Sequence, residues 1–229
     1  MTESRFVHAL GLGLDTAWRR LPTAERCQSA DDLVAAVRVD SEVTTYSYSM
    51  VGLQPGSDLL LWSLGPTLDS LEERSAMVLR SGMGRWMHVK ESFLGVIQPS
   101  QYVKKPTPQE QSLFSGERSR YLIVYPFTKN TEWYLLTREA RQAIMNGHMR
   151  VGHQHPEVRQ LLANSFGIDD MDFLVAYETD DLPKFGDLVR ELRGTESRRS
   201  TVRDTPILTG IHRPIDEITA LLGATNDSA

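Results

Sequence analysis

The 229-residue sequence predicts an α+β fold, and three observations lead to this prediction. Strand-like runs and helix-like segments follow the order β-α-β-β-α-β, and this order recurs after residue 120. Segments of the two halves match at an offset of about 114 residues. A stretch punctuated by proline and glycine separates the halves. We therefore expect a duplicated ferredoxin-like fold, a dimeric α+β barrel with two facing antiparallel sheets and outer helices.

The first half, residues 1–103, is expected to contain six main elements. Runs of β-branched, aromatic and leucine residues predict strands at 6–14, 43–53, 58–64 and 93–97. Ser29 and Thr67 each precede apolar residues at helical spacing, so both are expected to cap helices. A shorter helix is expected around Trp18 and is interrupted at Pro22.

Residues 104–119 are expected to form a linker, because Pro106, Pro108 and Gly116 interrupt any regular element. The second half, residues 120–229, is expected to repeat the order of the first. It would have strands starting at residues 121, 172 and 205, helices over 137–149 and 182–193, a helical turn over 156–163 and a terminal helix from residue 215.

The match between the halves lies in two short segments. SMVG at 49–52, followed by DLLL at 58–61, resembles SFG at 165–167, followed by DFLV at 172–175. The second spacer is one residue shorter, and Leu68 then aligns with Leu182. The alternative is a pair of unrelated α+β domains.

Composition and charge exclude several classes of protein. A net charge of −5 argues against a nucleic-acid binder. Cys27 is the only cysteine, so neither an intrachain disulfide nor a cysteine-based metal site can form. No apolar run reaches the ~18–20 residues of a membrane span, and the first residues lack a signal-peptide pattern. We therefore expect a cytoplasmic protein that does not bind membranes.

Four residue types that together build haem pockets occur close together in the second half. The strand YLIVYPF leads through Tyr125 to Lys129, Trp133 follows, and a helix capped by Thr137 carries His148 near its end. An imidazole, a phenol, a cation and an aromatic wall suit a haem site. Each also has a simpler explanation: a capping histidine, a strand tyrosine bonded to backbone, an exposed lysine and a core tryptophan.

Two further histidines lie nearby, at positions 153 and 155, and raise the alternative of a zinc or nickel site. His148 and His153 are five residues apart, which is not the spacing that places two ligands on one helical face. A loop with two solvated histidines is the preferred interpretation.

A resemblance to a known family adds to these observations. Over about ninety residues, several motifs occur in a shared order. They are YPxxK at 125–129, WY at 133–134, MxxH at 145–148, VRQ at 158–160, SFGIDD at 165–170, DF at 172–173 and LRxTE at 192–196. This segment resembles the C-terminal half of the chlorite dismutase-like haem proteins, which include the coproheme decarboxylases.

The resemblance implies roles for individual residues. His148 would be the axial ligand of the iron, and Tyr125 would be the phenol that forms a radical beside a propionate. Lys129 would hold the propionate that reacts second, and Trp133 would pack along the macrocycle. Tyr102, and either Arg118 or Arg120, would contact propionates.

At two positions, a shift of the alignment by one residue would change which residue takes the implied role. Gln160 would be the distal residue, where chlorite dismutases carry an arginine, and its neutral amide would orient peroxide without attracting chlorite. Arg159 would take that position only if the register slipped by one. Likewise, either Glu196 or Ser197 would lie beside the proximal imidazole.

The resemblance thus implies a coproheme decarboxylase that binds iron-coproporphyrin III and uses hydrogen peroxide to convert two propionates to vinyls, giving haem b. A homopentamer and a ferrochelatase that supplies the tetrapyrrole are also implied. The alternatives are a chlorite dismutase or peroxidase-like haem enzyme, and a haem-binding carrier or sensor without turnover.

Overall fold

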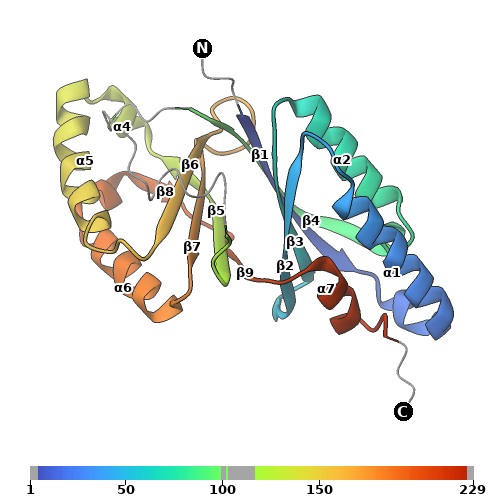
Figure 1. Cartoon of the computed structure of the whole chain (residues 1–229). Helices are drawn as coiled ribbons and strands as arrows, with labels where there is room; N and C mark the ends of the chain where they lie inside the picture. Colours follow the sequence, from blue (N-terminus) through green and yellow to red (C-terminus); the bar gives the residue numbers. More distant parts are fainter. Residues whose placement is uncertain (1–4, 99–101, 103–116, 226–229) are drawn as a thin grey trace. The chain divides into compact units, whose positions relative to one another are not determined.

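The computed structural model describes residues 5–98, 102 and 117–225 (Figure 1). Most of the predicted linker therefore lies outside the described residues. The chain divides into two compact units, one formed by Met1–Val96 with Thr209–Ala229 and the other by Ile97–Leu208. No helix within the described ranges is long and apolar enough to cross a membrane.

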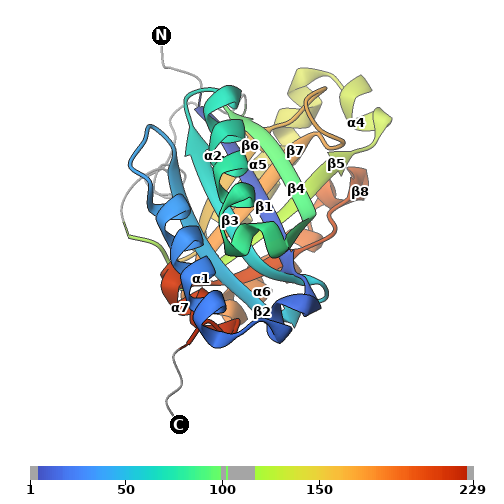
Figure 2. The same ribbon diagram turned by 90° about the vertical axis from the view of Figure 1, so that its right-hand side faces the viewer.

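The first unit contains an antiparallel sheet with helices on one face. Its strands hydrogen-bond in the order β4-β1-β3-β2-β9, and α1 and α2 cross the same face of this sheet (Figure 2). Its elements are β1 Arg5–Leu14, the 3-10 helix η1 Thr16–Arg20, α1 Thr23–Arg38, β2 Thr44–Gln54, β3 Ser57–Gly65, α2 Leu68–Arg80, η2 Met83–Trp86, β4 Met87–Ile97, β9 Leu208–His212 and α7 Ile215–Leu221.

The helix starts in this unit follow capping chemistry in one case and proline geometry in the other. Thr67 caps α2, and its hydroxyl accepts a hydrogen bond of 3.1 Å from the Ser70 amide. Ser29, the other predicted cap, lies inside α1. This helix starts directly after Pro22, whose fixed φ suits a helix entrance. The prediction of a start at Ser29 was therefore wrong by two turns.

The second unit has a four-stranded antiparallel sheet in the order β6-β7-β5-β8. Helices α5 and α6 lie beside this sheet (Figure 1), and side chains from both pack on one of its faces. The elements are β5 Tyr121–Lys129, α4 Thr131–Leu135, α5 Arg138–Gly152, β6 Arg159–Asn164, β7 Phe173–Thr179, α6 Leu182–Arg193, η4 Glu196–Ser200 and β8 Thr201–Arg203.

Two predicted elements differ from the structure. Residues 156–163 do not form a helical turn, because Leu161 and Ala163 alternate with more exposed neighbours and β6 pairs with β7. The strand expected over 205–211 becomes β9, which pairs with β2 of the first unit. There Ile215 and Ile218 of α7 join a core that includes Trp18. Residues 209–229 thus belong with the first unit, whereas the sequence placed them in the second half.

Candidate functional site

The strand register of the second unit places two of the predicted site residues on one face of the sheet. Tyr125 of β5 lies opposite Val175, and Gln160 of β6 lies opposite Tyr177 of the same central strand. Residues directly opposite one another on antiparallel strands share a face. Tyr125, Val175 and Tyr177 also pack in a cluster with side chains of α5 and α6. Tyr125 and Gln160 therefore lie on the helix-covered face.

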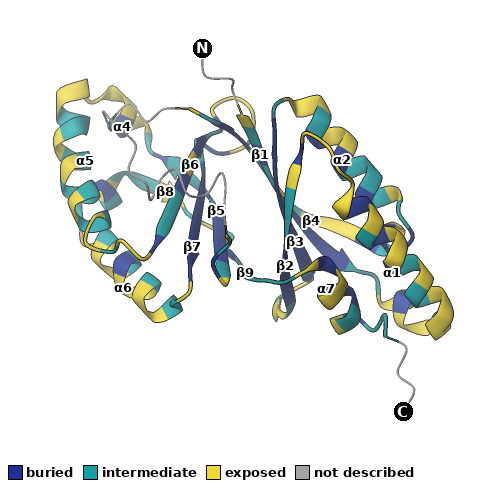
Figure 3. Ribbon diagram, in the orientation of Figure 1, coloured by how far each residue is buried: buried dark blue, intermediate teal, exposed yellow. Residues whose placement is uncertain are grey.

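Helix α5 covers this face incompletely. Thr137 caps it as predicted, accepting a hydrogen bond of 3.3 Å from the Ala140 amide. His148 and Val151 are three residues apart and share a side, and Val151 packs in the cluster on the sheet. All fifteen residues of α5 are described and none is buried (Figure 3). The apolar side of the helix is thus only partly covered by protein.

His148 has the properties of a neutral, uncommitted imidazole. Its Nδ1 atom is buried and has no hydrogen-bond partner among the described residues. Burial, together with the positive charge of Lys129, lowers its pKa to about 4. The ring is therefore uncharged near neutral pH, and a neutral imidazole nitrogen is the form that binds a metal.

Lys129 is buried rather than exposed at the end of its strand. Its ammonium group donates to the Ser197 carbonyl at 2.7 Å and to the Ser197 hydroxyl at 2.9 Å. It also lies 4.6 Å from the centre of the Trp133 ring. Burial and the charge of Arg198 lower its pKa to about 8. The structure thus places the cation inside the wall of the site, with two of its three donors bonded to Ser197.

Trp133 forms part of the same wall. It is 3% exposed, and its amide donates a hydrogen bond of 3.0 Å to the side chain of Asn130, the cap of α4. Asp172 fixes the adjoining backbone, because it accepts from the Lys129 amide at 2.7 Å and from the Tyr134 hydroxyl at 2.6 Å. Trp133 therefore also fills space in the core, which was the simpler explanation for a tryptophan at this position.

Tyr125 carries a neutral phenol. Burial raises its pKa well above the usual value, and the neighbouring Tyr177 raises it further. The two rings are stacked, with centroids 6.2 Å apart and planes 28° apart. Tyr125 thus packs against another side chain, whereas the simpler explanation was a strand tyrosine bonded to backbone.

Arg159 and Gln160 point to opposite faces of the sheet. The Arg159 guanidinium lies 2.9 Å from the fully buried Glu178 carboxylate and donates to the Ser119 hydroxyl at 2.8 Å. Arg118 lies 3.5 Å from the same carboxylate. In this register the residue on the helix-covered face is Gln160, and Arg159 and Arg118 are engaged on the other side.

The remaining predicted residues lie at different places. The Tyr102 carbonyl accepts a hydrogen bond of 3.3 Å from Gln142, in the first half of α5. Ser197 is buried and Glu196 is exposed, so Ser197 is the one inside the site. His155 lies 3.2 Å from the Glu191 carboxylate. Across the described ranges, no group of three or more His, Cys, Asp or Glu could hold a bare metal ion.

Sequence reasoning missed Tyr177 and the role of Ser197 in bonding Lys129. Both lie far from the YPxxK motif in the chain and meet it only through sheet pairing and the turn before β8. The available signal for Tyr177 was its place in DFLVAY, where strand alternation puts it on the same face as Phe173.

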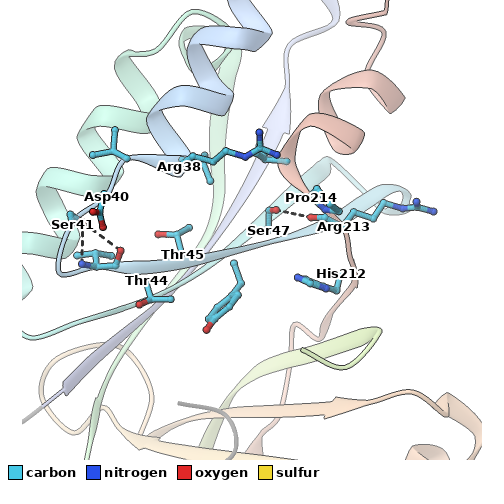
Figure 4. Close-up of a pocket in the computed structure, with 14 residues that line it drawn as sticks. Arg38, Asp40, Ser41, Thr44, Thr45, Ser47, His212, Arg213 and Pro214 are labelled. Atoms are coloured by element: carbon cyan, nitrogen blue, oxygen red, sulfur yellow. Dashed lines mark hydrogen bonds between the residues drawn. The ribbon is translucent and has the colours of Figure 1, made fainter. Parts of the chain in front are cut away.

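A groove of about 450 Å³ lies in the first unit (Figure 4). It runs between the end of α1, β2 and the segment after β9, and its lining includes Arg38, Thr45 and His212. The Ser47 hydroxyl donates to the Arg213 carbonyl at 2.7 Å, which joins β2 to that segment. None of the predicted site residues lines it.

Known proteins are similar to this chain over most of its length. A family model described as chlorite dismutase matches residues 23–213. A coproheme decarboxylase of Mycolicibacterium smegmatis is 28% identical over 177 residues, which cover 76% of this chain and 75% of that protein.

Solved structures are also similar to this chain. The chlorite dismutase of Candidatus Nitrospira defluvii in complex with imidazole is 29% identical, with a TM-score of 0.86 over 98% of this chain and 97% of that one. A mutant of that enzyme in complex with cyanide is also 29% identical, with a TM-score of 0.88 over the same shares of the two chains. The matched family model covers well over half of the sequence, so this chain belongs to the chlorite dismutase family.

Proposed function

We propose that the chain is a coproheme decarboxylase that uses hydrogen peroxide to convert iron-coproporphyrin III to haem b. One observation carries the proposal. A neutral phenol, Tyr125, and a neutral amide, Gln160, lie on the sheet face opposite the partly covered side of α5, which carries the neutral imidazole of His148.

The residues of this region fit an iron tetrapyrrole. On the sheet, Tyr125, Phe127 and Gln160 are only half-buried, although helices cover their face, and Leu162 is 41% exposed. A flat apolar group between the sheet and α5 would complete the burial of both surfaces. His148 would be its axial ligand, and the buried Trp133 would form one edge of the pocket.

When bound, the tetrapyrrole supplies the redox chemistry with peroxide that no side chain can supply. For each reaction, one propionate, one hydrogen peroxide and one proton give one vinyl group, one carbon dioxide and two waters. Tyr125 would give up its phenolic hydrogen atom and then take one from the β-carbon of the propionate. Lys129 would hold the second propionate by exchanging its bond to the Ser197 hydroxyl for one to the carboxylate. Tyr102 remains a proposed propionate contact.

Gln160 favours this activity over chlorite decomposition. A neutral amide can donate to and accept from peroxide but does not attract an anion as a guanidinium does. The neighbouring Arg159 is bound to Glu178 and cannot replace it without breaking a buried ion pair. A chlorite dismutase or peroxidase-like enzyme, or a carrier without turnover, is the alternative.

We further propose that the two units are duplicated ferredoxin-like modules joined by residues 104–119. The strand order is β4-β1-β3-β2 in the first unit and β8-β5-β7-β6 in the second. When these four strands of each unit are numbered along the chain, both orders read fourth, first, third, second. Gly52 and Gly167, aligned between the halves, also share a positive φ of 72° and 68°. A cytoplasmic homopentamer that receives its tetrapyrrole from a ferrochelatase belongs to the same proposal.

The test is to add iron-coproporphyrin III to the purified protein, titrate hydrogen peroxide and follow the porphyrin by mass spectrometry. We expect two successive losses of carbon dioxide plus two hydrogens. Tyr125→Phe should abolish both losses while the porphyrin still binds. Tyr121→Phe, a change at another half-buried tyrosine of β5, is the matched control and should retain both.

Two other results would overturn the proposal. Binding without any mass loss would leave the carrier or the peroxidase-like alternative, which the decomposition of added chlorite would separate. Failure of the porphyrin to change its absorption with either the wild type or His148→Ala would mean that no tetrapyrrole site exists here.

A further inference from the structure

Tyr125 does not stand alone on its sheet face. Tyr177, on the central strand β7, is 4% exposed and stacks on Tyr125 with centroids 6.2 Å apart. The Phe185 ring of α6 also lies near it, with centroids 5.2 Å apart and planes at 54°. The Tyr177 ring therefore packs with both the proposed reactive phenol and α6.

Each phenol also affects the pKa of the other. Burial raises the pKa of Tyr177 to about 12, while the neighbouring Tyr125 acts in the opposite direction. The neighbouring Tyr177 also raises the pKa of Tyr125, which burial already holds well above its usual value, so both phenols are neutral. Two neutral phenols thus lie next to each other, with their rings stacked.

This arrangement suits transfer of a hydrogen atom. The donor and acceptor are chemically identical, so exchange between them has little driving force in either direction. Both rings are held by packing and need little movement. In the strand register, Gln160 lies directly opposite Tyr177, and Tyr125 lies opposite Val175, two residues before Tyr177 on β7. The tyrosine pair is therefore next to the proposed distal amide on the sheet.

We propose that Tyr177 is a second redox residue and that Tyr125 and Tyr177 hold the oxidising equivalent as a pair. This inference rests on the proposed function. After Tyr125 has given up its hydrogen atom, its phenoxyl oxygen takes the hydrogen atom of the Tyr177 hydroxyl. One O–H bond breaks at Tyr177 and one forms at Tyr125, and no further oxidant or proton is needed.

The exchange would keep an unused oxidising equivalent in a buried ring. Hydrogen peroxide, acting through the bound tetrapyrrole, supplies the equivalent. If no propionate hydrogen is in place, it would be shared between the two rings and so spend part of its time on Tyr177, the less exposed of the two. When the second propionate is in place, the hydrogen atom would return to Tyr177 and make Tyr125 reactive again.

The first test needs no tetrapyrrole. The protein is labelled with 3-fluorotyrosine, and its fluorine NMR spectrum is recorded at neutral pH without porphyrin. We expect Tyr177→Phe to shift the Tyr125 resonance, which is assigned by its loss in Tyr125→Phe. Tyr121→Phe should leave it in place. An unchanged Tyr125 resonance in Tyr177→Phe would overturn the pair, whatever the protein does with porphyrin.

The second test is electron paramagnetic resonance of samples frozen shortly after coproheme-loaded protein meets peroxide. The wild type should show two tyrosyl signals, and Tyr177→Phe should retain one, with the higher gx of a phenoxyl that lacks a hydrogen bond. We expect Tyr177→Phe to slow decarboxylation about three- to ten-fold, as for the loss of one hydrogen bond. Tyr121→Phe should match the wild type.

The outcomes separate this inference from the proposed function. Decarboxylation with identical radical spectra in Tyr177→Phe and Tyr121→Phe would overturn the exchange and leave the decarboxylase intact. Altered radical and fluorine spectra without any loss of carbon dioxide would support the pair and refute the decarboxylase. The ring that Tyr177→Phe introduces would keep the packing against Phe185, so a thermal melt close to that of the wild type serves as the folding control.

Discussion

The ammonium group of Lys129 lies 4.6 Å from the centre of the Trp133 ring and is bonded to Ser197. This contact joins the end of β5, the start of α4 and the turn before β8. The interaction between a desolvated cation and an indole ring contributes about 2 kcal/mol. The same charge lowers the pKa of His148 across the site. Lys129 thus influences both the wall and the proposed ligand.

Replacing Lys129 by methionine should raise the pKa of His148. Burial is the larger cause of the lowered value and remains in the variant, so the pKa should rise above about 4 but stay below the ordinary value near 6.5. The measurement is a pH titration of the histidine ring signals by NMR in the porphyrin-free protein. Lys184→Met, at an exposed lysine, should leave His148 unchanged.

Replacing Arg159 by methionine should destabilise the protein without removing the proposed site. Glu178 is fully buried and would lose the nearer of two guanidinium groups, since Arg118 is the more distant. Loss of one partner of a buried ion pair costs about 3 kcal/mol, which urea unfolding would measure. Arg190→Met breaks an exposed pair and should cost less than about 0.5 kcal/mol. Equal stabilities of the two variants would contradict the buried pair.

Much of the second unit follows from local sequence. The β-branched run ending at Phe127 forms β5, and Thr137 caps α5. Residues 156–163 were misjudged because their short apolar run fits a strand or a helical turn equally well. Only pairing with β7 decides between them, and that pairing also decides that Gln160 and Arg159 face opposite ways.

The less predictable features depend on contacts distant in sequence. Nothing near Lys129 indicates that Ser197, 68 residues further on, will bury its ammonium group. Likewise, the apolar pattern of residues 215–222 predicts a helix but not its partner. That partner is the first unit, where Trp18 donates to the Leu222 carbonyl at 3.1 Å.

The phenol pair should make the porphyrin-free protein sensitive to alkali. Burial keeps Tyr177 protonated to a pKa of about 12, whereas an unfolded tyrosine ionises near 10. The unfolded state therefore binds fewer protons between these values, and stability falls as pH rises from about 10 to 12. The free energy of unfolding should fall by about 2 kcal/mol less in Tyr177→Phe than in the wild type between pH 9 and pH 11.5, and urea unfolding at the two pH values measures this difference. Equal losses in variant and wild type would contradict a buried neutral Tyr177.

Ser197 and Glu196 should differ sharply when replaced. Ser197→Ala removes one acceptor of a buried ammonium group, which costs about 1–3 kcal/mol, while the Ser197 carbonyl remains. Glu196→Gln changes an exposed side chain and should stay within about 0.5 kcal/mol of the wild type. Urea unfolding of both variants decides which of the two belongs to the site. A larger effect from Glu196→Gln would restore the other register.

Gln160→Arg should convert the helix-covered face from neutral to anion-binding. The new guanidinium would stand opposite Tyr177 on β7 and could form a charge-assisted bond worth about 1.5–3 kcal/mol, so nitrite should bind the porphyrin-loaded protein at least about tenfold more tightly. Absorbance titration measures this affinity. Gln154→Arg adds the same charge at an exposed position and controls for net charge.

Equal affinities in the two variants would mean that residue 160 does not face the bound tetrapyrrole. Tighter binding confined to Gln160→Arg, together with slower decarboxylation, would assign the distal position to this strand and explain why a neutral amide suits peroxide there.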